Sequence, residues 1–212
     1  MNTYELSHIN KSIHKSEILN NINLKLNRGC IYGLVGKNGS GKTMLIRLMA
    51  GLIQPSSGKI LIDGNEVDLF RKRDINIGIV IENITLNPEL TGFKNLKYLA
   101  SIQNKIGDNE IKNTLLQVGL DPDDKRKVRK YSLGMRQKLS LAQCFMENPD
   151  LILLDEPTNG LDEASVENIR LLIKEHAQRG AVICLASHNK EDIEELSDEI
   201  YMVRNHTLEV EP

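Results

Sequence analysis

The hydrophobic pattern predicts strands near both ends of the chain. From Ile22 to Leu26 apolar side chains occupy every second position, so residues 18–27 are expected to form a half-exposed strand. Residues 60–62 repeat this alternation before the turn residues Gly64 and Asn65. Continuous apolar runs predict buried strands of the kind that parallel sheets contain, and these runs cover 29–35, 77–81, 151–154 and 182–186.

Helical spacing governs the middle of the chain. Between about Leu96 and Glu147 apolar residues recur at helical intervals, and Gly107 and the Asp121-Pro122 step divide this region into segments at 96–100, 111–118 and 139–146. Further helices are expected at 44–50, ending at Gly51, and at 163–178. The pattern therefore predicts an α/β fold whose strand-rich core is interrupted by a helical insert.

One octapeptide carries the clearest chemistry. Residues 36–43 fit the pattern G-x-x-x-x-G-K-[ST], and they lie between a predicted buried strand and a predicted helix. Backbone N–H groups and a helix N-terminus can hold phosphates there, Lys42 can reach the β- and γ-phosphates, and the Thr43 hydroxyl can bind Mg²⁺. An ordinary glycine-rich turn would not need the Lys-Thr pair. We therefore predict a nucleoside triphosphate site made by Gly36, Lys37, Asn38, Gly39, Ser40, Gly41, Lys42, Thr43 and Met44.

A pair of carboxylates predicts the metal and the base for this site. Asp155 and Glu156 follow the apolar run at 151–154, and a parallel strand delivers such residues to the sheet edge where ligands bind. Asp155 would hold Mg²⁺ opposite Thr43, and Glu156 would polarise a water that attacks the γ-phosphate. The alternative is a surface loop that happens to begin with two acids, which the pairing with a phosphate loop disfavours.

Two more segments indicate a functional role only in combination with the phosphate loop at 36–43. Ser132 can cap the helix that follows it and Gly134 allows close approach of an anion, but alone they indicate no more than a helix start. His188 follows the predicted strand at 182–186 after one residue, Ser187. A lone histidine is usually a satisfied polar residue, but at this edge it could hydrogen-bond a γ-phosphate.

Composition narrows the class of protein. The chain has 27 Lys and Arg against 29 Asp and Glu, a net charge of −2, so no nucleic-acid partner is expected. Three widely spaced cysteines offer no disulfide framework, which suits a reducing cytoplasm. The first residues do not form a signal peptide, and the apolar runs fall short of the ~20 residues that span a membrane. Membrane association is therefore expected only through a partner.

The ordered motifs resemble the ATP-binding subunit of an ABC transporter. They are the phosphate loop at 36–43, a variant of the family's LSGGQ signature at 131–135, Asp155-Glu156, the loop at 160–162, and His188. The resemblance implies a single ABC ATPase domain over residues 1–212. Its fold would be a P-loop NTPase core, a mixed sheet flanked by helices, with an antiparallel β edge and an α-helical subdomain inserted at 83–148.

The resemblance also implies roles and partners. In this family the phosphate loop of one subunit and the signature of a second enclose ATP, so Ser132 and Gly134 would contact the partner's nucleotide. Glu156 would be the catalytic base, His188 the γ-phosphate sensor, and Asp162 part of the link between the two sites. The implied cofactors are ATP and Mg²⁺. The implied partners are a second copy of the chain and an integral-membrane permease, which holds the ATPase at the inner face of the cell membrane.

Departures from the family pattern point to a branch. Glu82 stands where the family has glutamine; its carboxylate can ligate Mg²⁺, although a neutral surface change is the alternative. Together with residues 90–96 and the Ser-Leu-Gly-Met form of the signature, it resembles the bacitracin-resistance and lantibiotic-immunity branch. That branch implies export of an antimicrobial peptide or similar amphipath. One alternative is a different transport cargo for the same kind of ATPase. Another is a soluble ABC-type ATPase acting on ribosomes or DNA, a class that usually has a second cassette or long insertions.

Two contacts of the family are altered. Ile13 stands where the family usually has an adenine-stacking aromatic residue, so only apolar contact with the base is expected, with weak base selectivity. Met135 replaces the signature glutamine, so polar contacts of that side chain are not expected.

Overall fold

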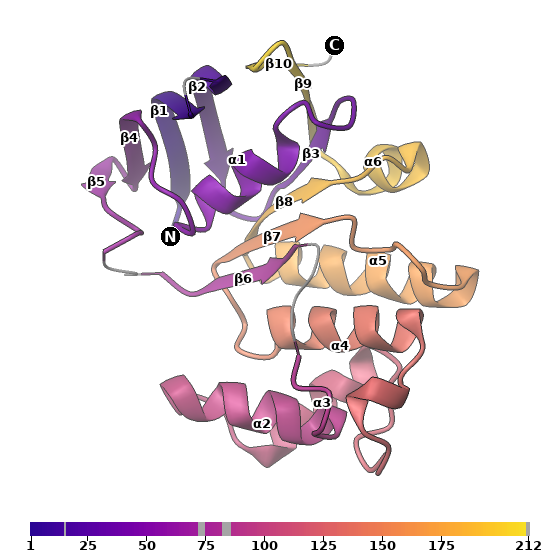
Figure 1. Cartoon of the computed structure of the whole chain (residues 1–212). Coiled ribbons are helices and arrows are strands. Elements are labelled where there is room, and N and C mark those ends of the chain that lie inside the picture. The colour runs from indigo at the N-terminus through magenta and orange to yellow at the C-terminus, as the bar shows by residue number, and fades with distance from the viewer. Residues whose placement is uncertain (15, 72–74, 82–85, 211–212) are drawn as a thin grey trace.

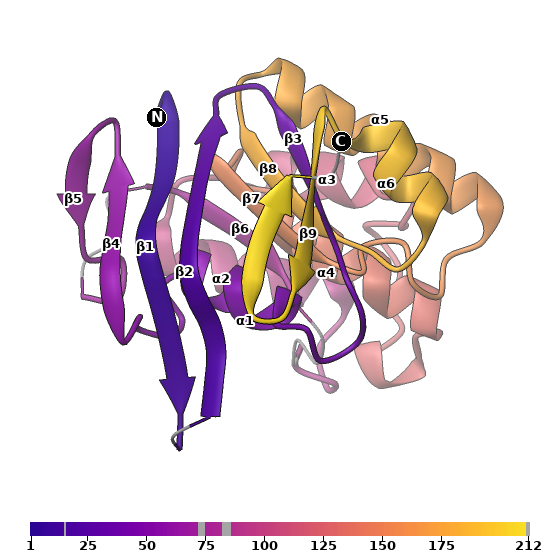
Figure 2. The same cartoon turned by 90° about the horizontal axis from the view of Figure 1, so that it is seen from above.

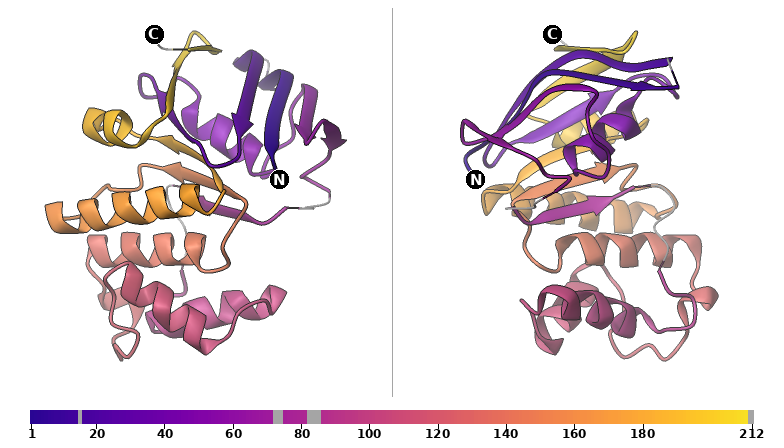
Figure 3. Two further views of the ribbon diagram at one scale, coloured as in Figure 1. Left: turned by 180° about the vertical axis from the view of Figure 1, so that it is seen from behind. Right: turned by 60° about the vertical axis from the view of Figure 1, so that its left-hand side comes forward.

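The chain folds into stacked layers (Figure 1), which the computed structural model describes for residues 1–14, 16–71, 75–81 and 86–210. An antiparallel sheet lies on one side, a mostly parallel sheet follows, and the remaining layers are helices. Figure 3 shows the same order from two other directions. Within the described residues, no helix combines the length and apolar character that crossing a membrane requires.

The central sheet is built from the continuous apolar runs. Its strand order is β10-β9-β3-β8-β7-β6, and all neighbours are parallel except β10 and β9. Every residue of β7 and β8 is buried, as expected for strands covered on both faces. The strands are β3 (Ile31–Val35), β6 (Ile77–Val80), β7 (Leu151–Asp155), β8 (Val182–Ala186), β9 (Glu199–Arg204) and β10 (Thr207–Val210). The four predicted buried strands are confirmed, whereas β9 and β10 were not predicted.

The second sheet is antiparallel, with the order β2-β1-β4-β5. Its strand β1 was not predicted because its apolar period changes partway: Tyr4 and Leu6 are buried, and the next buried residue is Ile9. A register shift lies between Leu6 and Ile9, where His8 has φ 50°. A bulge of this kind moves later side chains to the other face, which hides the alternation in the sequence. The strands are β1 (Thr3–Ile13), β2 (Ser16–Asn27), β4 (Ser57–Ile62) and β5 (Asn65–Val67).

Helix α1 (Lys42–Met49) lies between the two sheets (Figure 1). Leu45, Ile46, Leu48 and Met49 are fully buried in a core shared with residues of β1, β2, β7 and β8. The sheets also meet at one edge, where β10 lies beside β2 (Figure 2), and the Asn20 N–H donates to the His206 carbonyl at 2.7 Å. The phosphate loop that precedes α1 is therefore held between two layers.

The other face of the central sheet carries the remaining helices. Helix α4 packs against β6 and also contacts α2 and α3, so the helical region shares one core with the sheet. These helices are α2 (Gly92–Gln103), α3 (Asp108–Gln117), the 3₁₀ turn η1 (Val128–Lys130), α4 (Leu133–Phe145), α5 (Glu163–Gln178) and α6 (Lys190–Leu196). The prediction for 163–178 is confirmed, and α6 was not predicted. Helices α2, α3 and α4 fall within residues 83–148, whose standing as a subdomain stays a prediction.

Candidate functional site

The loop at residues 36–43 joins β3 to α1, and its glycines allow it to curl. Gly36, Gly39 and Gly41 have φ of 149°, 77° and 112°, a region that disfavours other residues. A Cβ on Gly36 would lie 2.5 Å from the Val203 carbonyl oxygen, so the loop also needs glycine for close approach to β9. The buried Ser40 Oγ has no hydrogen-bond partner within the described residues. The loop thus offers an unused polar group inside a tight turn.

The ammonium group of Lys42 is hydrogen-bonded to the backbone of this loop. Its side chain is largely buried, and Nζ donates to the carbonyl of Gly36 at 2.6 Å and to that of Lys37 at 3.3 Å. Helix α1 has Gly41 at its N-cap, no side-chain cap and no acidic residue in its first turn. Nothing from its own first turn therefore competes with an anion for the N-terminal N–H groups and the helix dipole.

The predicted metal ligands Thr43 and Asp155 lie together. The Thr43 hydroxyl donates to Oδ2 of Asp155 at 2.6 Å, and Asp155 is buried at the carboxyl end of β7. Hydroxyl and carboxylate oxygens are ligands that Mg²⁺ accepts, and in nucleotide sites the phosphates complete its shell. No group of three or more His, Cys, Asp or Glu side chains suits a metal in the part of the chain that the structure describes. The third predicted ligand, Glu82, lies outside the described residues.

Glu156 and His188 face each other beside this pair. Nδ1 of His188 lies 2.7 Å from Oε2 of Glu156, and the His188 N–H donates to Oε1 at 3.0 Å. The Glu156 side chain is 17% exposed, whereas that of His188 is 71% exposed. The structure therefore brings together the two residues predicted to be catalytic and leaves the carboxylate partly open to water.

The backbone at Glu156 is unusual. Its φ of 52° is left-handed, which is uncommon for any residue other than glycine and indicates that the surroundings impose it. The Glu156 N–H donates to the Ala186 carbonyl at 2.8 Å, and the Glu156 carbonyl accepts from Nε2 of Gln137 at 3.1 Å. Strand β8 and helix α4 thus both fix this position. Gln137 was not predicted as a site residue, because only the fold brings it beside the loop after β7.

A cavity of about 550 Å³ brings together most of the predicted phosphate residues, the metal ligands Thr43 and Asp155, and both predicted catalytic residues, whereas the predicted Gly36 and Lys37 are not among its described lining residues. It is lined by residues 38–44, Asp155, Glu156 and His188, together with Ile18, Arg47 and Asn159, which were not predicted. The predicted base contact, Ile13, pairs with Ser16 at the end of β1 and is not among the described lining residues. Ile18 lies on the neighbouring strand β2, so the hairpin decides which isoleucine faces the loop.

The signature segment lies elsewhere on the chain. Ser132 is the N-cap of α4 and accepts from the Met135 N–H at 3.2 Å, which confirms the predicted cap. A Cβ on Gly134 would lie 2.9 Å from the Gly160 carbonyl oxygen, so the signature packs closely on the loop at 160–162. Asp162 caps α5, and its hydrogen bonds from Ser165 hold the pKa of the Asp162 carboxyl below its ordinary value. Ser132 and Gly134 do not line the described part of the phosphate-loop cavity.

Comparison with known proteins agrees with this site. The family model described as ABC transporter matches residues 19–159. An uncharacterised ABC transporter ATP-binding protein, YybJ of Bacillus subtilis (strain 168), is 43% identical over 95% of this chain and 92% of its own length. The lantibiotic transport ATP-binding protein SrtF of Streptococcus pyogenes is 36% identical, over 92% of this chain and 83% of its own.

A third relative and a solved structure extend the match. The bacitracin transport ATP-binding protein BcrA of Enterococcus faecalis is 34% identical over 97% of this chain and 68% of its own length. The dimeric structure of a bacterial ABC transporter cassette superposes with a TM-score of 0.87, at 24% identity, over 97% of this chain and 96% of the other. The predicted fold class and the predicted resemblance are thereby confirmed. The chain belongs to the ABC transporter family and is an ATP-binding subunit with ATPase activity.

Proposed function

We propose that this ATPase powers export of an antimicrobial peptide or a similar amphipath through a separate membrane permease. The names of two relatives support the cargo, since SrtF is a lantibiotic transport protein and BcrA a bacitracin transport protein. The proposed role in ATP hydrolysis rests on one observation, the contact of Glu156 with His188 at the edge of the phosphate-loop cavity.

Each residue of the proposed ATP site lies where it can perform a particular chemical role. The loop N–H groups and Lys42 would bind the phosphates of ATP, with Lys42 exchanging its carbonyl partners for phosphate oxygens. Thr43 and Asp155 would hold Mg²⁺, with Glu82 as a further proposed ligand. When bound, Mg²⁺ neutralises charge on the phosphates. The lining residue Ile18 would give the base or ribose apolar contact, beside or in place of Ile13.

Hydrolysis would then depend on Glu156. Its carboxylate would accept a proton from the water that attacks the γ-phosphate, while His188 keeps the carboxylate oriented and reaches the γ-phosphate. The two contacts from His188 fix the plane of the carboxylate before any nucleotide arrives. A preoriented base lowers the reorganisation that the reaction requires.

Two features of the single chain support the proposed partners: signature residues that lie apart from the nucleotide cavity, and exposed apolar side chains on α2. Ser132 and Gly134 lie apart from the cavity, so they would complete the nucleotide site of a second copy in a homodimer of cassettes. The side chains of Tyr98 and Ile102, 68% and 72% exposed, lie four residues apart on α2. Exposed apolar side chains on one helix support a docking surface for the permease there. Through that permease the ATPase would lie at the inner face of the cell membrane.

An affinity experiment tests this function. We expect tagged chain, purified from detergent-solubilised membranes of its native host, to bring down one polytopic membrane protein in stoichiometric amount, identified by mass spectrometry. Cells that express both proteins should survive more peptide antibiotic than cells carrying the Glu156→Gln chain. Recovery of ribosomal or nucleoid proteins without a membrane partner would contradict transport and favour the soluble ATPase.

A further inference from the structure

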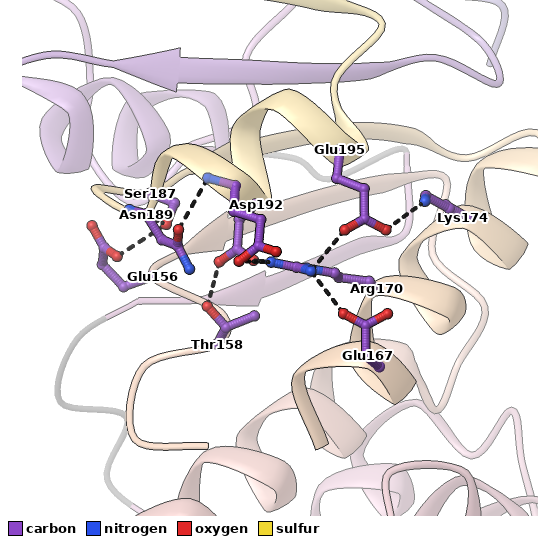
Figure 4. A network of polar contacts seen from close by, with 10 residues as sticks. Glu156, Thr158, Glu167, Arg170, Lys174, Ser187, Asn189, Asp192 and Glu195 are labelled. Carbon is purple, nitrogen blue, oxygen red and sulfur yellow. Dashed lines mark hydrogen bonds and ion pairs between the residues drawn. The ribbon is translucent and has the colours of Figure 1, made fainter. Parts of the chain in front are cut away.

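We infer that Arg170 is a positioning residue for ATP hydrolysis, which acts through Asp192 and Thr158 on the turn that carries Glu156. The inference rests on the proposed role of Glu156 as the base. Arg170 lies on α5 and Asp192 on α6, and neither is among the described residues that line the phosphate-loop cavity. Figure 4 shows the contacts that join Arg170, Asp192 and Thr158, and beside them the contact of Glu156 with Ser187.

Arg170 is a buried cation surrounded by carboxylates. Its side chain is 3% exposed, and its Nε and Nη2 donate to Oδ1 of Asp192 at 2.9 and 2.7 Å. Nη1 donates to Glu167 and Glu195, both at 2.7 Å (Figure 4), and Nη2 also lies 3.3 Å from Oε2 of Glu191. The planar guanidinium can satisfy several acceptors in fixed directions, which an ammonium cannot do. Arg170 therefore fixes α5 and α6 to each other.

Asp192 connects Arg170 to the loop that follows β7. It is fully buried, and each of its oxygens has a different partner: Oδ1 accepts from Arg170, and Oδ2 accepts from the Thr158 hydroxyl at 2.5 Å. A buried carboxylate is stable only when paired and hydrogen-bonded. Removal of Arg170 would leave the Asp192 charge unpaired, and removal of the Thr158 hydroxyl would leave Oδ2 without its donor. The position of Thr158 is therefore coupled to Arg170 through a single carboxylate.

Thr158 belongs to the turn that begins at Glu156. The Asn159 N–H donates to the Glu156 carbonyl at 3.3 Å, and the Pro157 carbonyl accepts from Gln137 at 2.9 Å. Glu156 is left-handed, and the contacts on both sides of it hold it there. Loss of the Thr158 hydrogen bond would free one side of this turn.

The same carboxylate also fixes the other member of the proposed catalytic pair. Asp192 lies in the first turn of α6, whose N-cap Asn189 follows His188 directly. The Asn189 N–H donates to the Ser187 hydroxyl at 3.1 Å, and that hydroxyl lies 3.4 Å from Oε2 of Glu156. Glu156, His188, α6, Asp192 and Thr158 thus form a closed ring of contacts. Arg170 joins this ring from outside at Asp192, and we expect their ion pair to position the base against the histidine.

Two variants of Thr158 in the full chain test the inference. Thr158→Val keeps the shape of the side chain but removes the hydroxyl, and Thr158→Ser keeps the hydroxyl. We expect Thr158→Val to lower kcat for MgATP by roughly tenfold to a hundredfold, with KM within about twofold of the unaltered protein. Thr158→Ser should restore most of kcat. The kcat of Arg170→Lys should lie between those of Thr158→Val and Thr158→Ser. Lysine keeps the positive charge but lacks the planar guanidinium that donates to several acceptors at once.

A double variant separates a positioning effect from general damage. If Thr158 acts through Glu156, then adding Thr158→Val to Glu156→Gln should slow the remaining hydrolysis no further. An unchanged kcat in Thr158→Val, an equal loss in Thr158→Ser, or a loss that multiplies with that of Glu156→Gln would overturn the inference. Full turnover by Glu156→Gln alone would instead overturn the proposed role of Glu156, which is a separate result.

Discussion

Nδ1 of His188 lies 2.7 Å from Oε2 of Glu156, while the backbone N–H of His188 donates to the other oxygen of the same carboxylate at 3.0 Å. The pair links the loops that follow β7 and β8, two adjacent parallel strands whose last residues, Asp155 and Ala186, are in register. The sheet therefore presents both side chains at one edge, next to Lys42 and Thr43.

The first prediction concerns the carboxylate of this pair. Glu156→Gln keeps the size of the side chain but removes the proton acceptor, so we expect hydrolysis to fall by about 10² to 10⁴ while ATP still binds. A bound but uncleaved nucleotide should hold two cassettes together. Light scattering of the variant in MgATP checks this, with ADP as the control. A variant that stays monomeric in ATP would contradict the proposed dimer.

The second prediction concerns the charge over the phosphate loop. Lys42→Ala should weaken ATP binding by about a hundredfold or more, because the partly buried ammonium supplies charge-assisted hydrogen bonds to the phosphates. Equilibrium titration with a fluorescent ATP analogue measures the affinity. Lys59→Ala is the matched control, since Lys59 is an exposed lysine paired with Glu66 on the antiparallel sheet. Retention of the original affinity by Lys42→Ala would refute the assignment of this loop.

The third prediction is a loss of stability in mild acid caused by His176. Burial, with a smaller contribution from the charge of Arg179, lowers the pKa of His176 from 6.5 to about 4, and the ring stacks on Phe145. The unfolded chain therefore binds the proton more readily, so stability is full above pH 6.5 and falls as the pH drops towards 4. Between pH 7 and pH 5 the loss should be about 2 kcal/mol.

Urea unfolding at both pH values measures this loss. The matched variant is His176→Leu, which has no group to protonate at that position. Its free energy of unfolding should change less between pH 7 and pH 5 than that of the unaltered protein, by about 2 kcal/mol. Equal changes in the two proteins would show that His176 is not responsible.

The fourth prediction concerns the base of the nucleotide. The described residues that line the phosphate-loop cavity include Ile18 and no Phe, Tyr or Trp. Apolar contact discriminates weakly between bases, so kcat/KM for ATP and GTP should agree within about tenfold. Steady-state hydrolysis of both nucleotides checks this. A preference of a thousandfold for ATP would indicate a hydrogen-bonding base pocket that the described cavity does not contain.

The sequence alone determined the local chemistry of this protein. The continuous apolar runs of β3, β7 and β8, the phosphate loop and the acids at the end of β7 follow from short-range patterns, because buried strands and anion-binding turns need particular residues at fixed spacing. The helix at 163–178 and the cap by Ser132 follow for the same reason. Strand β1 was harder to predict, because the bulge at His8 changes its apolar period there.

Only the tertiary structure decided which distant residues meet. The sequence spacing does not show that Gln137 reaches the Glu156 carbonyl, that Ile18 rather than Ile13 lines the described cavity, or that Asp192 joins Arg170 to Thr158. These contacts depend on strand order, on hairpin pairing and on the packing of α5 against α6, which are long-range properties. A sequence pattern specifies how a segment buries its apolar side, but the alignment of one buried segment with another depends on the whole core.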